Sequence, residues 1–279
     1  MNITINGETA NIILETEHTV GDILIGLEPW LNDGGFRMSG LSINGAAVAA
    51  DRLADVMDQN ICDVQDLAIL AETYSSLTLQ ALEEAIELLA AYAGAEDEEK
   101  RHIRADWEQC AAASFLLNQA PDLFRLINQC VAGDSPAPQI LISLISQRIR
   151  EVQDPAGELL MMKDLVDSIS LRLEEFPLDM QTGNDLKAFE TVHIFSDTVE
   201  KLFRLFYNLK FTGASFEDLV IGDIPITSYL EEFRTALQEL LSAYQSGDTV
   251  LIGDLSEYEM APRLRGFYEA LFNSINTST

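Results

Sequence analysis

The chain has 279 residues, of which 47% are hydrophobic and 23% are charged. This composition is too apolar for a disordered chain, and the length suffices for one large or two modest hydrophobic cores. Seventeen basic residues against forty-six acidic residues give a formal net charge of −29. Such a charge repels phosphate backbones and anionic lipids, so it argues against nucleic-acid and membrane partners.

We expect neither a membrane span nor a secretion signal in this sequence. Its apolar runs are shorter than the roughly 18–20 residues that cross a bilayer, and the start, MNITING, lacks the basic and apolar regions of a signal peptide. Three cysteines (Cys62, Cys110 and Cys130) lie far apart, which suits neither a disulfide framework nor a zinc site. We therefore expect a cytoplasmic protein whose cysteines are buried and reduced.

Residues 1–73 contain short segments with the two-residue period of β-strands. The dipeptide Asn6-Gly7 joins the first two segments, MNITING and TANIILET, as a hairpin turn does. A helix is expected from about Val20, with Asp22 placed to cap its first turn. Pro29 is expected to end or kink this helix.

The same region continues with FRMSGLSING, which alternates like a strand and ends in a second Asn-Gly turn at Asn44. A helical turn is expected around Arg52–Met57, and a last strand over Asp66–Ala71. Hairpin, helix, strand, turn and closing strand follow one another in an order that resembles ubiquitin and its relatives. The resemblance implies a β-grasp fold for residues 1–73, about a quarter of the chain.

This resemblance does not extend to the conjugation chemistry of ubiquitin. The last strand is followed by Glu72-Thr73-Tyr74 and a helical pattern instead of a free Gly-Gly tail, and the first lysine of the chain is Lys100. Without conjugation chemistry, the resemblance implies a β-grasp domain that serves as a docking surface. Twelve acidic residues against Arg37 and Arg52 in residues 1–73 predict a protein partner with a basic or apolar surface.

From residue 75 the apolar period changes to that of helices. Residues 75–274 are expected to form an all-α bundle or array of seven to eight helices, and residues 275–279 a frayed tail. The longest helix is predicted over Asp185–Leu209, a rod of roughly 40 Å. Its expected buried face consists of apolar residues spaced mostly three or four apart: Leu186, Phe189, Val192, Val199, Leu202, Phe203 and Phe206. The predicted fold class is therefore α+β.

A short sequence echo relates Val220–Ile224 to Leu251–Leu255, and each copy precedes an amphipathic helix. The structural explanation of this echo is a pair of similar helical hairpins. In the first copy, Asp223 is expected to be the N-cap of the helix. The functional alternative is an exposed acidic and aromatic docking site, because exposed aromatic residues beside charges act as interface anchors. Its candidate residues are Asp254, Glu257, Tyr258 and Glu259.

A metal site is the remaining chemical hypothesis, since phosphate loops, nucleophile elbows and zinc-protease signatures do not occur. The pairs Glu99–His102 and Glu190–His193 have the Glu-x-x-His spacing of di-metal helical bundles. Against this reading, Glu99 and His102 lie in the highly charged start of their helix. With so many glutamates the spacing also arises by chance, so we expect no metal, cofactor-binding or catalytic residue.

The sequence therefore favours a non-catalytic adaptor or scaffold with a ubiquitin-like docking domain. The alternative is an acidic helical chaperone for a secretion or assembly substrate, suggested by the negative charge and the Met161-Met162 pair. A di-metal carboxylate bundle is the third hypothesis. No pattern identifies a reaction or a particular partner.

Overall fold

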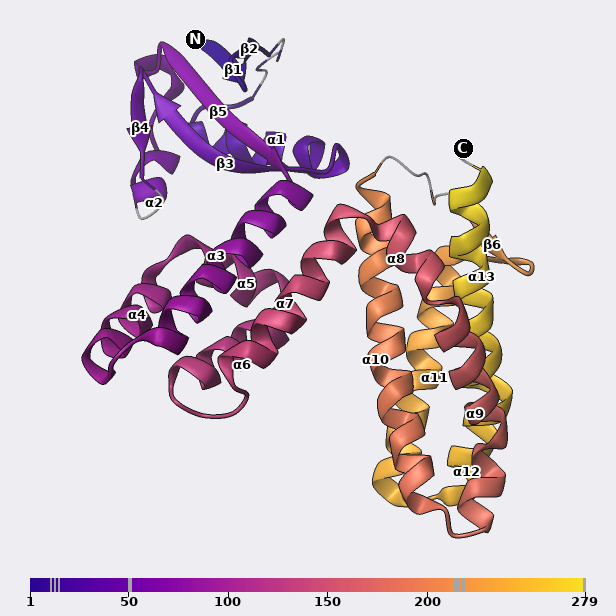
Figure 1. Ribbon diagram of the computed structural model, residues 1–279. Coiled ribbons are helices and arrows are strands. Elements are labelled where there is room, and N and C mark those ends of the chain that lie inside the picture. Colours follow the sequence, from indigo (N-terminus) through magenta and orange to yellow (C-terminus); the bar gives the residue numbers. More distant parts are fainter. Residues whose placement is uncertain are drawn as a thin grey trace. The chain divides into compact units, whose positions relative to one another are not determined.

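The computed structural model describes residues 1–10, 12, 14, 16–49, 52–212, 216 and 219–277, with the backbone alone for Asp185 and Thr277 (Figure 1). The contacts divide the chain into two compact units, Met1–Ile145 and Ser146–Thr279. The division falls inside helix α7 (Pro138–Gln153). The predicted boundary after residue 73 is instead the point at which sheet gives way to helix.

The N-terminal unit begins with a five-stranded mixed sheet in the order β2-β1-β5-β3-β4. The neighbours β1 and β5 are parallel and the other pairs antiparallel. The strands are β1 (Asn2–Ile5), β2 (Glu8–Thr9), β3 (Phe36–Ile43), β4 (Ala46–Val48) and β5 (Asp66–Thr73). Helix α1 (Val20–Asp33) packs on one face, and short helices α2 (Leu53–Met57) and η2 (Ile61–Asp63) follow β4. The α+β class is thereby confirmed, and the sheet is compatible with a β-grasp.

Both predicted Asn-Gly turns occur, and their asparagine side chains fasten the turns to β5. Asn6 and Asn44 each adopt a φ of 51°, a left-handed conformation that asparagine tolerates better than most residues. The Asn6 amide donates to the carbonyl of Ala71 and accepts from its N–H, both at 2.9 Å. The Asn44 Oδ1 accepts from the N–H groups of Gln65 at 2.7 Å and Asp66 at 3.1 Å. Each turn thus supplies a long-range contact as well as a local reversal.

Replacement of Asn44 by alanine is expected to destabilise the N-terminal unit by about 2 kcal/mol, since it removes the side-chain acceptor and puts at a φ of 51° a residue that tolerates the left-handed region less well than asparagine does. Urea denaturation followed by circular dichroism measures the loss. Glycine adopts the left-handed conformation readily but has no side-chain acceptor, so Asn44→Gly should reduce the free energy of unfolding by about half as much. An Asn44→Ala chain as stable as the parent would contradict this account.

Helix α1 starts at a capping box and continues past the expected break. The N–H of Asp22 donates to Thr19 Oγ1 at 3.1 Å, and Asp22 Oδ2 accepts from the N–H of Thr19 at 2.9 Å. Backbone hydrogen bonds from His18 and Thr19 lower the pKa of Asp22. The prediction that Pro29 ends the helix is wrong, because α1 runs to Asp33. Pro29 and Ile25 are both exposed, so water can bond the Ile25 carbonyl that lacks its helical donor.

Helices complete the N-terminal unit after β5. They are α3 (Tyr74–Gly94), α4 (Asp97–Gln109), α5 (Ala111–Gln119), α6 (Pro121–Val131) and the first half of α7. Residues 97–119 contain no proline or glycine, yet they form two helices, because Cys110 is extended and its Sγ caps α5 by accepting from the N–H of Ala113 at 3.3 Å. Trp107 on α4 is 1% exposed, and its Nε1 donates to Asn128 Oδ1 on α6 at 2.7 Å.

The C-terminal unit is an elongated bundle in which α9, α10, α11 and α13 run side by side (Figure 1). Its elements are α8 (Pro155–Met161), α9 (Lys163–Gln181), α10 (Asp185–Lys210), β6 (Val220–Ile221), β7 (Ile224–Pro225), α11 (Ile226–Ser246), α12 (Thr249–Asp254), the π-helical η3 (Leu255–Met260) and α13 (Ala261–Thr277). The long predicted helix is confirmed as α10. The described helices after residue 73 exceed the expected seven or eight, and α13 extends past the expected end at 274.

The buried face of α10 differs from the predicted one in its first turns. Leu186 is 88% exposed and Phe189 is 63% exposed, whereas Ala188 and Phe195 are buried. The last turns follow the expected stripe, with Val199 among the buried residues. Apolar residues occur on several sides of this helix, so the neighbours α8, α9 and α13 determine which of them are covered.

The two copies of the sequence echo have different structures. Val220–Ile221 and Ile224–Pro225 pair as a small hairpin around Gly222, whose φ is 62°. The second copy lies in α12 and the start of η3. The prediction that Asp223 caps a helix is wrong, because α11 begins after Pro225. Similar sequences here adopt structures set by their different surroundings.

The carboxylates of Glu151 and Glu158 in the C-terminal unit are buried and ion-paired. Glu151 on α7 is 1% exposed and accepts from Arg204 Nε at 2.8 Å and Nη2 at 3.2 Å. Glu158 on α8 accepts from Lys201 Nζ at 2.6 Å. Both cations lie on α10, so these pairs fasten α7 and α8 to the longest helix.

Among the described helices, none combines the length and the apolar character needed to cross a bilayer. The three cysteines are free, and only Cys130 is buried, since Cys62 is exposed and Cys110 half-buried. Burial raises the pKa of the Cys130 thiol. The expectation of buried cysteines therefore holds for Cys130 and is wrong for Cys62.

Candidate binding pocket

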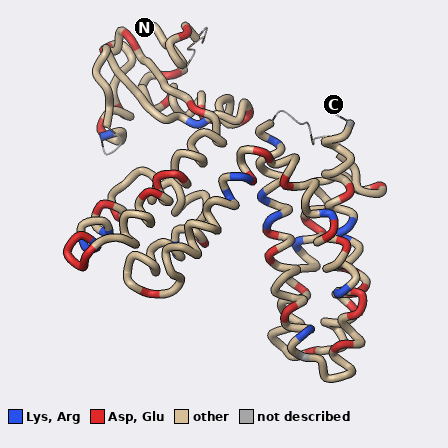
Figure 2. The backbone as a smooth tube through the Cα atoms, in the orientation of Figure 1, with Lys and Arg blue, Asp and Glu red and all other residues tan. Residues whose placement is uncertain are grey.

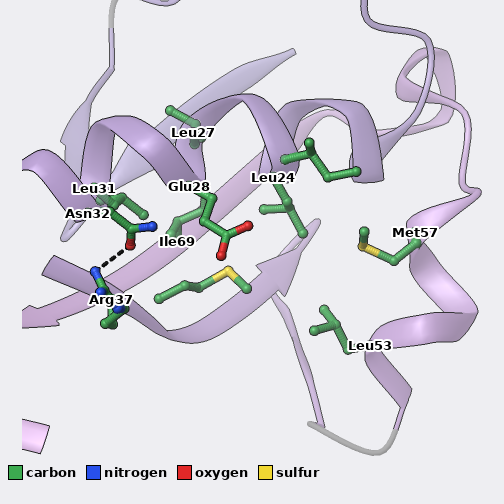
Figure 3. Close-up of a pocket in the computed structure, with 11 residues that line it drawn as sticks. Leu24, Leu27, Glu28, Leu31, Asn32, Arg37, Leu53, Met57 and Ile69 are labelled. Carbon is green, nitrogen blue, oxygen red and sulfur yellow. Dashed lines mark hydrogen bonds between the residues drawn. The ribbon is translucent and has the colours of Figure 1, made fainter. Parts of the chain in front are cut away.

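The N-terminal unit contains a pocket of about 310 Å³ between α1, α2 and β3 (Figure 3). This volume is at the lower end of the range for small-ligand and side-chain pockets. The lining residues are mostly apolar: Leu24, Ile25, Leu27, Glu28, Leu31, Asn32, Arg37, Met38, Leu53, Met57 and Ile69. The pocket therefore offers an apolar interior with a small set of polar groups.

The pocket has buried leucine and isoleucine walls and adaptable methionines. Leu24 and Leu31 of α1 and Ile69 of β5 are core residues that also line the pocket. Met38 of β3 is 37% exposed, and Met57 of α2 is half-buried. Methionine has flexible torsions and a polarizable sulfur, so it fits apolar groups of different shapes. The pocket can thus accept an aliphatic or aromatic side chain without a fixed outline.

Three polar side chains line the pocket, and two of them already interact. Arg37 donates to the Asn32 side-chain oxygen and to the carbonyl of Phe36, the latter at 3.0 Å (Figure 3). Its guanidinium lies 5.9 Å from the ring centre of Tyr74, and burial raises the pKa of this tyrosine. Within the described residues, the carboxylate of Glu28 has no hydrogen-bond or ion-pair partner. Such a carboxylate suits a cation or an N–H donor of a bound partner.

A second hollow of about 410 Å³ lies against β1, β2 and the end of α1. Trp30, 62% exposed, and Phe36 belong to its lining. Leu31 lines both hollows. The end of α1 therefore separates two apolar depressions of the same unit.

The docking residues predicted from the sequence lie elsewhere, in the C-terminal unit. Asp254 ends α12, and Glu257, Tyr258 and Glu259 lie on η3. Tyr258 is 65% exposed, and a hydrogen bond and negative charge from Glu257, together with the charge of Asp254, raise its pKa. Glu259 pairs with Arg263 at 2.9 Å. The structure thus brings the four together on one helical stretch, and their docking role stays a prediction.

The Glu-x-x-His residues are exposed, and two of them, His102 and Glu190, make other interactions. On α4, Glu99 and His102 are exposed, and His102 Nδ1 lies 3.0 Å from the Glu98 carbonyl. On α10, Glu190 pairs with Arg172 at 2.9 Å while His193 is exposed. In the described part of the chain, no group of three histidine, cysteine or carboxylate side chains is arranged to hold a metal ion.

Acidic residues are spread over both units (Figure 2). The turn between α3 and α4 carries the densest group, which includes Glu96–Glu99 (Figure 2). Many basic residues of the C-terminal unit are paired with acids, among them Lys187 with Asp179 at 3.0 Å. The unpaired negative charge that a partner would meet is therefore distributed and not confined to one predicted site.

Sequence reasoning missed the pocket although it anticipated parts of its wall. The helical pattern predicts that Leu24 and Leu27 face the core, and the strand pattern marks Met38. Leu53 and Met57 reach the same space from a short helix at a later position in the chain. The two methionines are the available signal, but methionine is as common in closed cores as at binding surfaces.

Two family models match parts of the chain. Residues 1–73 match the TP0873 N-terminal domain, and residues 158–270 match a domain of unknown function, DUF8042. The chain is 30% identical over 101 residues to an uncharacterized protein of Treponema pallidum (strain Nichols). The aligned part is 36% of this chain and 50% of that protein, so the chain spans half the length of the relative it matches. No solved structure was found to match the chain.

Proposed function

We propose that this chain is a non-catalytic adaptor that binds a partner protein through its N-terminal unit, and that residues 1–73 are a ubiquitin-like β-grasp. The mixed sheet in the order β2-β1-β5-β3-β4, covered by α1, supports the β-grasp assignment. The apolar pocket between α1, α2 and β3 carries the functional proposal. Its walls suit an apolar anchor of a partner, and two of its polar side chains, Arg37 and Asn32, already bond each other, which supports a binding role.

The charge of residues 1–73 supports a basic partner. Twelve acidic residues accompany Arg37 and Arg52, and these two arginines are engaged by Asn32 and Asp55. A basic protein surface would be attracted over the distance of a Debye length, about 8 Å at physiological salt. The pocket would then supply the short-range apolar contact.

An acidic helical chaperone for a secretion or assembly substrate is the second candidate. Met161 at the end of α8 is 70% exposed, and Leu160 and Leu165 beside it are also exposed. These residues would contribute an apolar surface for such a substrate. Met162 is buried in the bundle core, so the methionine pair does not supply one continuous groove. We therefore favour the adaptor.

The adaptor proposal predicts a stoichiometric protein complex. The full chain, used as bait in lysate of its native cell, should retain a protein that also binds as a purified component in a 1:1 complex measured by analytical ultracentrifugation. Salt near 0.5 M should weaken this complex, because screening removes the charge attraction. The absence of any such partner, or turnover of a small molecule by the purified chain, would contradict the proposal.

A further inference from the structure

Part of β3 is an edge of the sheet. Strand β4 pairs with Leu41–Ile43 of β3. Strand β5 pairs with Phe36–Met38 and with Gly40–Ile43 of β3, and the register shifts between these two stretches at a bulge between Met38 and Gly40. Among the described strands, the segment Phe36–Gly40 therefore has a neighbour on one side, β5, and none on the other. A strand edge presents backbone N–H and C=O groups that can pair with another strand. Five residues give this edge a length of about 17 Å.

The pocket opens directly beside this edge. Arg37 and Met38 belong both to the edge segment and to the pocket lining. In a strand, alternate side chains point to the same face. An extended segment paired with the edge would therefore direct every second side chain toward α1, α2 and the pocket. Backbone pairing supplies affinity in such strand addition, and the pocket supplies specificity.

The charge beside the pocket indicates what the added segment carries. Glu28 of α1 points toward the space between the helix and β3 (Figure 3), and its carboxylate has no partner within the described residues. A lysine or arginine two positions from the apolar anchor would project from the same face, about 7 Å away, and could pair with Glu28. A second copy of this chain would instead bring another net charge of −29, which repels the first.

We propose that the edge Phe36–Gly40 and the adjoining pocket bind an extended segment of a partner protein that adds as a strand to β3. The segment places an apolar side chain in the pocket and a basic side chain, two residues away, at Glu28. This inference rests on the proposed adaptor function and specifies the chemistry of its partner: an apolar-x-basic sequence in β conformation.

Selection from a random peptide library of about eight residues on the immobilised full chain tests the proposal. The enriched peptides are then titrated by fluorescence anisotropy. They should share the apolar-x-basic spacing. N-methylation of alternate residues removes the N–H groups that face β3 and should weaken binding about tenfold or more, whereas methylation of the intervening residues should leave binding within about twofold.

Variants of the full chain locate the site. Met38→Lys places a charge at the pocket and edge and should weaken binding about tenfold or more, and Glu28→Gln about threefold. The matched control is Leu70→Lys on β5, which replaces another exposed apolar residue outside the pocket lining and should change affinity less than about twofold. A changed circular dichroism spectrum would show that Met38→Lys disturbs the fold. The test of the site then uses the affinities of Glu28→Gln and of the methylated peptides.

Several outcomes would overturn the inference. These are enrichment of no peptide, affinity indifferent to N-methylation, and equal binding by scrambled peptides, which would indicate attraction to the acidic surface alone. A dimer that Met38→Lys dissociates would identify a second copy as the occupant and also overturn it. A cellular partner retained equally by the parent and Met38→Lys chains would leave the adaptor function standing and remove this site from it.

Discussion

Replacement of Arg204 by alanine is expected to destabilise the C-terminal unit by about 3–5 kcal/mol. Glu151 is buried, and Arg204 supplies two hydrogen bonds to its carboxylate, at 2.8 and 3.2 Å. Removal of the guanidinium leaves a charge inside the protein without a counter-ion, and the cost is the desolvation of that charge. The effect should appear as a lower unfolding midpoint in guanidinium chloride.

Two controls separate this mechanism from a general loss of contacts. The double variant Glu151→Leu, Arg204→Met removes both charges and should recover most of the stability, because apolar pairs of similar volume replace buried ion pairs at little cost. Arg234→Ala breaks the surface pair with Glu231, whose side chains are 57% and 65% exposed, and should cost below about 0.5 kcal/mol. If Arg204→Ala proves as mild as Arg234→Ala, the buried pair does not hold α7 to α10.

The second large effect is expected in the N-terminal unit, where Trp107→Ala should cost about 3–5 kcal/mol. Trp107 packs against Phe124, with ring centres 6.1 Å apart, and bonds Asn128 at 2.7 Å. Alanine would leave a cavity between α4 and α6 and an Asn128 oxygen without its donor. Trp107→Phe retains much of the ring packing and loses the hydrogen bond, so a cost of about 1–2 kcal/mol is expected.

The other tryptophan serves as the matched control. Trp30 is 62% exposed, and Trp30→Ala should change the stability of the unit by less than about 0.5 kcal/mol. Because the chain has two tryptophans, the fluorescence of a Trp30→Phe chain reports Trp107 alone during denaturation. Equal costs for Trp107→Ala and Trp30→Ala would show that the α4–α6 contact contributes little.

Strands β1, β3 and β5 of the N-terminal sheet could be predicted because their signals are local. The second predicted strand, TANIILET, differs from the two-residue β2 (Glu8–Thr9), and residues 11, 13 and 15 of that segment lie outside the described part of the chain. Two-residue alternation marks β3 and β5, and the φ of 51° at Asn6 and Asn44 is the conformation that an Asn-Gly turn requires. The sequence could not show that each asparagine side chain also bonds β5, since those contacts join residues about sixty and twenty positions apart. Hairpins are local, whereas their attachment to the sheet is not.

Helix ends were predicted less well where a proline, which usually ends a helix, lies inside a helix of the structure. Pro29 lies inside α1, and Pro177 inside α9 in contact range of Gly253 on α12. Proline removes one hydrogen bond, and packing of the flanking turns offsets that loss. Conversely, Cys110 divides a stretch that lacks proline and glycine. A tertiary neighbour, Gly253, lies beside Pro177, whereas Pro29 is exposed to water and the break at Cys110 coincides with a local cap on the N–H of Ala113.

The candidate pocket depends still more on tertiary structure. Leu24, Met38 and Met57 come from a helix, a strand and a second helix that follow one another at intervals of more than ten residues. The helix α2, which follows the short strand β4, brings Met57 to the same pocket as Leu24 and Met38. The predicted docking residues Asp254, Glu257, Tyr258 and Glu259 are close in sequence, so they could be proposed without a structure. Their spacing gave no information on whether they line a concave site.

The sequence by itself determined the α+β class, the alternating and helical regions, the turns and the long helix α10, because hydrophobic period and turn chemistry are properties of neighbouring residues. Only the tertiary structure decided which face of α10 is buried, where Glu151 and Glu158 find their cations, and that part of β3 remains an edge beside a pocket. These features depend on the packing of distant segments, where burial and pairing energies exceed local preference.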